Sequence, residues 1–199
     1  LITAQPPAPG LPPLIIEDVQ VFPTDSRTRD TRGYVYTNIQ LPFAMLATLG
    51  ASYQDYDGEL TSDGIANNFD RFNPKVGIRW NLMPNLTARA AYFETVKPVL
   101  VSNRTLEPTQ VAGFNQFFDD PDATRSERYG AGLDWRPLNE LKLGGELTRR
   151  QVESPVVDFA ARAMRYENRD EWLHRAYVFW EPAARWALSA EGVYDKFTN

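Results

Sequence analysis

The sequence predicts an all-β fold, namely an antiparallel up-and-down transmembrane β-barrel, partial or incomplete, with short periplasmic turns and long extracellular loops. Three observations predict it. About eight segments alternate apolar and polar residues with the period of two that half-buried strands show. Their connections alternate between short and long along the chain, as in outer-membrane barrels. Three of the short connections also share one pattern, in which a tryptophan is followed by a turn and an apolar residue.

The composition excludes several classes of function. The 199 residues include no cysteine and one histidine, which argues against disulfides, thiolate catalysis and clustered Cys or His metal sites. The net charge is −5, so a broad basic surface for nucleic acid is not expected. No apolar run approaches the ~18 residues of a membrane-spanning helix, whereas alternating barrel strands keep the mean hydropathy low. The sequence predicts neither an enzyme nor a cofactor, because it has no phosphate loop or nucleophile elbow.

The chain divides into two predicted regions. Residues 1–32 are expected to be a Pro-rich linker and a polar loop, in which 14–22 could form one strand. Residues 33–199 are expected to be a β-barrel segment of about eight strands. These strands are predicted at 33–41, 43–56, 72–82, 86–97, 126–136, 141–153, 169–181 and 185–197.

The connections between these strands fall into two classes. Tight turns are expected around Pro42 and at 83–85, 137–140 and 182–185. Long connections are expected at 57–71, 98–125 and 154–168, the last with a short helix at Asp158–Arg165. A soluble sandwich has no reason to alternate short and long connections, whereas an outer-membrane barrel has short turns on one side and long loops on the other.

Tryptophans mark one end of the predicted strands. The segments WNLMPNL, WRPLNEL and WEPAARWAL each place tryptophan beside a short turn. Indole rings favour the membrane–water interface, so these residues are predicted to form part of an aromatic girdle. Tryptophans that merely end strands in a soluble meander are the alternative. The girdle residues are Trp80, Trp135, Trp180 and Trp186.

Each predicted strand has one apolar and one charged, glycine-containing face. In 126–136, for example, Leu133 and Trp135 share a face opposite Arg128 and Asp134. A soluble sandwich would bury the apolar face, and a barrel would expose it to lipid. The apolar faces are rich in Ala, Gly and Leu, and they lack the side-chain volume that a soluble core needs. This composition favours the barrel.

The charged faces supply the predicted functional surface, which would line the lumen. Two interpretations stay open: a ladder of ion pairs that fills the barrel interior, or a basic lumen that selects anionic solutes. The predicted lumen-lining residues are Lys75, Arg79, Arg89, Arg128, Asp134, Arg136, Lys142, Glu146 and Arg150.

The connection 98–125 carries two further candidates. Three aromatic residues could constrict the lumen, touch a ligand or pack within the loop: Phe114, Phe117 and Phe118. Three carboxylates could supply oxygen ligands to Ca²⁺, but their spacing is not that of an EF-hand, so a solvated acidic loop is favoured: Asp119, Asp120 and Asp122.

Two segments carry a family resemblance. Phe72–Glu94 (FNPKVGIRWNLMPNLTARAAYFE) resembles a barrel hairpin of TonB-dependent receptors. Leu106–Asp120, followed by RYGAGLD, is similar to a segment of barrels fused behind tetratricopeptide repeats, which are implicated in export or uptake of large polar molecules. The resemblance covers about residues 33–197. We see no plug domain, TonB box or tetratricopeptide repeat, and we expect at least one closing strand to be missing.

Together these observations predict a bacterial outer-membrane channel or transporter component that passes a polar solute or polymer. The expected partners are outer-membrane lipid, a polar or polysaccharide-like substrate, other envelope proteins and a missing part of the same barrel, but no nucleic acid. Two alternatives remain at this point. One is a scaffolding barrel that binds envelope proteins, and the other is a soluble β-sandwich or lipocalin-like module that binds a ligand.

Overall fold

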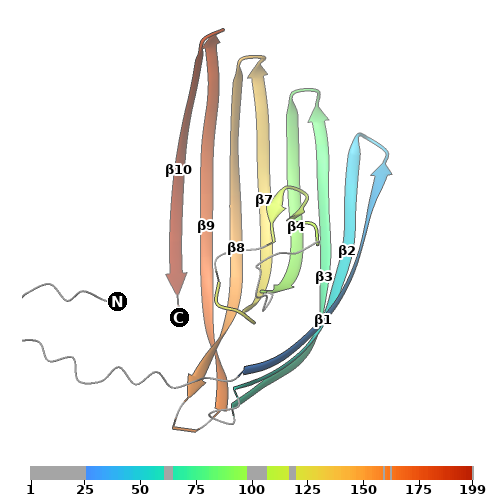
Figure 1. Ribbon diagram of the computed structural model, residues 1–199. Coiled ribbons are helices and arrows are strands. Elements are labelled where there is room, and N and C mark those ends of the chain that lie inside the picture. Colours follow the sequence, from blue (N-terminus) through green and yellow to red (C-terminus); the bar gives the residue numbers. More distant parts are fainter. Residues whose placement is uncertain are drawn as a thin grey trace, which may run out of the picture.

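A computed structural model of the chain describes residues 26–60, 65–97, 107–116, 120–158, 160–161 and 163–198. In these residues eight long strands form one antiparallel sheet in the order β1-β2-β3-β4-β7-β8-β9-β10, and two short strands form the hairpin β5–β6 (Figure 1). The long strands are β1 (Ser26–Leu41), β2 (Met45–Leu60), β3 (Ile65–Met83), β4 (Leu86–Val96), β7 (Arg125–Leu138), β8 (Leu141–Asp158), β9 (Ala163–Ala183) and β10 (Trp186–Thr198). The short ones are β5 (Gln110–Val111) and β6 (Phe114–Asn115).

The four predicted tight turns are confirmed. They occupy residues 42–44, 84–85, 139–140 and 184–185, and all lie at the same end of the sheet. In the first of them Phe43 and Ala44 have positive φ values of 62° and 57°, so the chain reverses within three residues after Pro42. We call this end of the strands the short-turn end.

The predictions of long loops at 57–71 and 154–168, two of the three, are wrong. β2 continues to Leu60 and β3 begins at Ile65, so most of 57–71 is strand. β8 continues to Asp158 and β9 begins at Ala163, so most of 154–168 is strand, and the helix predicted at 158–165 is replaced by a hairpin. The polar composition of these segments suggested loops. A pair of strands with both faces in water, however, does not need an apolar face to remain hydrogen-bonded. Stacked pairs such as Tyr56 and Phe69, with ring centroids 5.1 Å apart, continue the pairing.

β1 also starts earlier than expected. It begins at Ser26 and pairs with β2 along its whole length, from Ser26 opposite Leu60 to Leu41 opposite Met45. Residues 26–32, which were expected in a loop, therefore form strand. The possible strand at 14–22 lies outside the described residues.

The two faces of the sheet differ in what covers them. Residues 107–116, including β5–β6, lie against one face over β4 and β7, and we call this the inner face (Figure 1). The opposite, outer face carries exposed apolar side chains such as Val76, Leu133 and Leu147, the last 60% exposed. No second large sheet packs on it in the described part of the chain, so the soluble sandwich is excluded as the fold. Across the same residues, no helix is long and apolar enough to cross a membrane.

The sheet does not close on itself among the described residues, because β1 and β10 form its two edges. Strand order, antiparallel pairing and an apolar outer face together make it a partial up-and-down barrel wall. The predicted fold class is confirmed.

Candidate functional site on the inner face

The strand register aligns the inner-face charges in two rows. Across β3, β4, β7, β8 and β9, Lys75, Phe93, Arg128, Arg150 and Glu171 lie opposite one another. Nearer the short-turn end, a second row runs through Arg79, Arg89, Gly132, Glu146 and Arg175. Because paired residues of an antiparallel sheet share a face, both rows point to the inner side.

The first row holds residues 107–116 and Asp120 against the sheet, so we call Lys75, Arg128 and Arg150 the anchor row. Lys75 Nζ lies 3.2 Å from Glu107 Oε1. Arg128 Nη1 donates to the Asn115 carbonyl oxygen at 2.8 Å, and Arg150 forms an ion pair with Asp120. All three cations are buried, Lys75 to 1% exposure, so each requires compensating partners. The segment supplies part of this compensation and the sheet supplies the rest, since Arg150 also pairs with Glu171 on β9 at 3.0 Å.

Small residues in the sheet make room for the β5–β6 hairpin. A Cβ atom added at Gly77 would lie 2.7 Å from the Ala112 Cβ and 2.9 Å from a Val111 methyl carbon. At Gly130 it would lie 2.7 Å from the Phe114 ring. Val111 and Phe114 are consequently 0% and 1% exposed. The hairpin therefore packs into a shallow trough of the wall and does not extend away from the sheet.

A second contact set closes the same segment from the β1 side. The Tyr36 hydroxyl donates to Glu107 Oε1 at 2.6 Å, and Gln116 Nε2 donates to that hydroxyl at 3.0 Å. Lys75 Nζ also donates to Ser52 Oγ and to the Glu94 carbonyl oxygen, both at 3.0 Å. The carboxylate of Glu107 thus lies between a cation and a hydroxyl, the arrangement that a buried charge requires.

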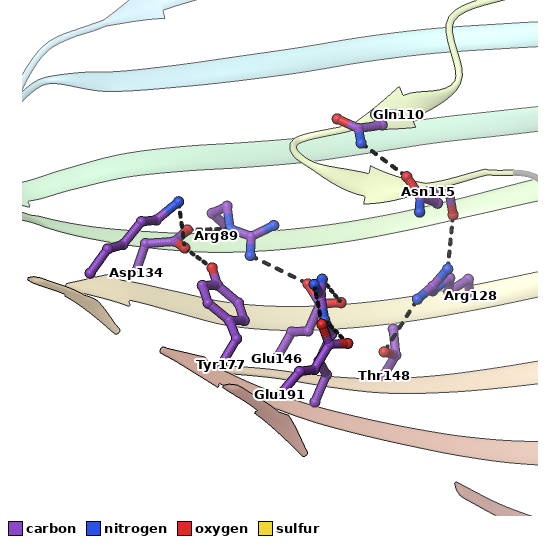
Figure 2. Close-up of polar contacts among 11 residues, drawn as sticks. Arg89, Gln110, Asn115, Arg128, Asp134, Glu146, Thr148, Tyr177 and Glu191 are labelled. Carbon is purple, nitrogen blue, oxygen red and sulfur yellow. Dashed lines mark hydrogen bonds and ion pairs between the residues drawn. The ribbon is translucent and has the colours of Figure 1, made fainter. Parts of the chain in front are cut away.

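The second row forms a network of ion pairs that Figure 2 shows. Arg89 Nε lies 2.8 Å from Asp134 Oδ2, and Arg89 Nη2 lies 3.3 Å from Glu146 Oε2. The Tyr177 hydroxyl donates to Asp134. Arg175 Nε lies 2.7 Å from Glu191 Oε1 on β10. The Arg89 guanidinium also lies 4.9 Å from the centroid of the Phe114 ring, so the hairpin and this network touch.

A recess of about 470 Å³ opens beside this network, toward the short-turn end. We call this cavity the basic recess. Its lining comes from β3, β4, β7, β8 and β9 and includes the turn residues Pro84 and Asn85 at one side. The charged residues are Arg79, Arg89, Asp134, Arg136, Lys142, Glu146 and Arg175.

The structure separates the predicted lumen-lining residues into two groups. Six of them lie around the basic recess: Arg79, Arg89, Asp134, Arg136, Lys142 and Glu146. The other three form the anchor row and contact residues 107–116 or Asp120: Lys75, Arg128 and Arg150. The sequence pattern placed all nine on one face, but it held no signal that a loop would fold back onto three of them.

The loop candidates are placed in part. Phe114 is buried against the wall, while Phe117, Phe118 and Asp119 lie outside the described residues. Asp120 forms an ion pair with Arg150, and Asp122 is exposed. Among the residues that the structure describes, no group of three or more His, Cys, Asp or Glu side chains could hold a metal ion.

The four predicted girdle tryptophans lie on the outer face at the short-turn end. Trp80 pairs with Met45, Trp135 with Leu86 and Trp180 with Leu141, so each of these rings lies at the start of a neighbouring strand beside a short turn, and Trp186 follows the next turn. All four are exposed, and Trp80 Nε1 donates to the Phe43 carbonyl oxygen at 3.0 Å.

A second aromatic band was missed by the sequence reasoning. Tyr92 and Tyr129 pair with ring centroids 4.9 Å apart, and the Arg149 guanidinium lies 5.2 Å from the Trp172 ring. Phe72 precedes Trp80 by about eight residues, or about 27 Å along a strand, which suits a tilted wall around an apolar band of about 25 Å. The sequence held a signal for this band, because aromatic residues recur six to eight positions from the short-turn end of the strands with the same parity as the tryptophans. The band comprises Tyr53, Phe72, Tyr92, Tyr129, Trp172 and Tyr194.

An apolar outer face between two aromatic bands and a charged inner face define the wall of an outer-membrane β-barrel. The family model for the TonB-dependent receptor-like β-barrel matches residues 3–153, so the chain belongs to that family and lies in the outer membrane. The resemblance to receptors of this class is confirmed. A search of curated protein sequences found no significant match.

Solved structures share the fold at low sequence identity. The FrpB iron transporter of Neisseria meningitidis matches with a TM-score of 0.65 and 13% identity, over 88% of this chain and 26% of that one. FpvAI in complex with pyocin S2 matches with 0.63 and 18%, over 88% and 24%. The siderophore receptor PiuA of Acinetobacter baumannii matches with 0.62 and 20%, over 87% and 26%. The chain therefore spans about a quarter of the length of each of these proteins.

Proposed function

We propose that this chain forms part of the barrel wall of an outer-membrane transporter that takes up a polar solute in a TonB-dependent manner. Membership of the TonB-dependent receptor-like barrel family carries the proposal. The wall supports it physically, because its outer face suits lipid and its inner face presents charged groups to a hydrated interior.

The proposed solute class is an iron chelate of the siderophore type. An iron transporter and a siderophore receptor are among the proteins of similar fold. The inner face can supply charge-assisted hydrogen bonds to such a solute through Arg89 and its neighbours. A polysaccharide-like polymer is the alternative solute, and the same inner wall would serve it through neutral hydrogen bonds.

Uptake by intact cells tests the proposal. A strain that lacks the gene and the same strain carrying the full-length gene are grown under iron limitation, and entry of ⁵⁵Fe bound to a panel of siderophores is followed. We expect uptake of at least one chelate to require both this protein and TonB. Uptake that needs the protein but not TonB would indicate a passive pore, and uptake that is unchanged in the deletion strain for every chelate would refute the transport role.

A matched pair of variants connects uptake to the inner face. Asp134→Asn removes the charge that Arg89 and Tyr177 contact. Glu167→Gln makes the same kind of change at an exposed carboxylate that pairs only with Arg165 in the described part of the chain. Equal amounts of folded protein and lower uptake for Asp134→Asn alone are expected.

A second candidate role is binding of a protein partner at the ends opposite the short turns. The β2–β3 and β8–β9 hairpins continue there as paired strands, which gives a partner a preformed surface. A similar barrel, FpvAI, has been seen in complex with pyocin S2. Deletion of residues 61–64, which connect β2 to β3 in the sequence, would weaken such binding but leave chelate uptake in place.

A further inference from the structure

The basic recess has an excess of positive charge that its own wall does not neutralise. Five cations and two carboxylates line it, which gives a formal charge of +3 in a chain whose overall charge is −5. Glu191, which lies beside it, neutralises Arg175 with a bond of 2.7 Å. Asp134 and Glu146 are both bound to Arg89, and Asp134 also lies 4.0 Å from Lys142 Nζ. With Glu191 counted, the formal excess is +2, and it is carried by Arg79, Arg136 and, in part, Lys142, which shares Asp134 with Arg89.

Two of these cations have no counter-charge of their own. Arg79 and Arg136 are exposed to the recess and form no ion pair within the described part of the chain. Arg79 also lies directly opposite Arg89 in the β3–β4 register, on the same face of the sheet. Like charges in opposed positions of an antiparallel pair destabilise the sheet. An anion between them would remove that repulsion, so the wall is arranged to gain free energy from an anionic ligand.

The other donors of the recess are held in place before any ligand arrives. Arg89 is fixed by two carboxylates and by the Phe114 ring, and a Cβ at Gly113 would lie 2.7 Å from its Nη1 atom. Lys142 Nζ lies 4.0 Å from Asp134 Oδ1 and 5.7 Å from the Tyr177 ring centroid. Donors that are already ordered lose little conformational entropy on binding, which favours affinity.

The size and place of the recess limit the occupant. About 470 Å³ is within the range of small-molecule sites and admits a solute with several anionic groups. The charged side chains of the recess lie on the inner face, and the recess reaches the short-turn end at Pro84, Asn85 and Trp135. A cation or an apolar group would meet unfavourable charges there.

We propose that the basic recess binds a multivalent oxyanion, a small solute that carries several carboxylate or phosphate groups, through Arg79, Arg136 and Lys142, with Arg89 as the fixed donor at its back. The site borders the β5–β6 hairpin at Gly113 and lies toward the short-turn end of the wall. This inference deepens the proposed function, and its meaning for transport rests on that function, but the binding itself does not.

Equilibrium binding to the full-length protein tests the inference without transport. The protein is purified in a neutral detergent at low ionic strength, and citrate and tripolyphosphate are titrated by calorimetry. We expect saturable binding of both probes that weakens with added salt. The double variant Arg79→Gln/Arg136→Gln should weaken it by about tenfold or more, because each replaced cation removes a charge-assisted hydrogen bond. Arg79→Lys/Arg136→Lys should restore most of the affinity.

A control of equal charge change separates the recess from the overall charge. Arg165→Gln/Arg185→Gln removes two exposed cations outside the recess, and its affinity should match that of the unmodified protein. The inference is overturned if neither probe binds protein that shows normal heat-modifiable mobility, or if the recess variant and the control bind equally. Binding that is intact in a protein with no chelate uptake refutes the proposed function alone.

Discussion

Replacement of Lys75 by methionine tests whether the anchor row keeps residues 107–116 inside the barrel wall. Lys75 is 1% exposed and Glu107 is 9% exposed, and their charged atoms are 3.2 Å apart. In Lys75→Met the Glu107 carboxylate keeps the Tyr36 hydroxyl at 2.6 Å but loses the cation. Removal of one partner of a buried pair costs about 3–5 kcal/mol, and we expect about 3 kcal/mol because the hydroxyl remains.

This loss of free energy should destabilise residues 107–116 more than the sheet, because Lys75 lies in the paired strand β3 and Glu107 lies outside the strands. The segment should therefore open about 100-fold more often. Hydrogen–deuterium exchange of the full-length protein in micelles measures this, with faster exchange in 107–116 and little change in the β3 and β4 amides.

Three comparisons decide the case for Lys75. Lys142→Met makes the same change at a half-exposed lysine 4.0 Å from its carboxylate, and it should leave exchange in 107–116 within about threefold of the original. Glu107→Gln added to Lys75→Met removes the buried carboxylate charge that has lost its lysine and should recover much of the protection. If Lys75→Met alone leaves exchange in this segment unchanged, the buried pair does not hold the loop and our reasoning fails.

Three further predictions concern the two faces of the sheet. Gly130→Val places a side chain where the Phe114 ring lies, 2.7 Å from the added Cβ, so it should displace the β5–β6 hairpin and raise exchange there. Trp80→Phe keeps a ring but loses the indole hydrogen bond to Phe43, and urea unfolding in lipid vesicles should show a loss of about 1 kcal/mol. Leu147→Arg puts a charge on the outer face and should cost about 2–4 kcal/mol in the same unfolding assay.

Controls for these predictions come from the same sheet. Gly192 has no atom within 4 Å of an added Cβ, so Gly192→Ala should leave hairpin exchange unaffected. Ser189 lies on the inner face of β10, opposite Phe179, so Ser189→Arg should destabilise the protein much less than Leu147→Arg. Equal losses for the arginines on the two faces would contradict the assignment of outer and inner faces.

The repeating part of the fold could be predicted from the sequence because one physical rule governs it. Alternation in a segment such as 126–136 fixes which side chains share a face, and the pattern of tryptophan and turn fixes where strands reverse. Eight of the nine charged residues predicted for one face lie on the inner face by strand register, and Arg136, at an irregularity of β7, lines the same recess.

The exceptions all depend on contacts that composition does not encode. Residues 154–158 and 163–168 read as a polar connection, yet they pair in register from Ser154 opposite Glu167 to Asp158 opposite Ala163. The inward fold of 107–116 depends on two glycines in distant strands, Gly77 and Gly130, which leave space for Val111 and Phe114. Such complementarity between segments far apart in sequence has no periodic signature, so the covering of the anchor row could not be anticipated.

The extended hairpins determine what the cell presents to its surroundings. β8 has 18 residues, and about 10 suffice to cross the hydrocarbon layer, so about eight further residues, about 26 Å along the tilted strand, continue beyond it as paired backbone. Proteases take their substrates as single extended strands, and a chain already bound on both sides offers them none. A molecule that approaches this end of the hairpin would meet a ridge of paired strands. Peptides copied from 154–158 or 57–60 would therefore be poor mimics of that ridge for raising sera against living cells.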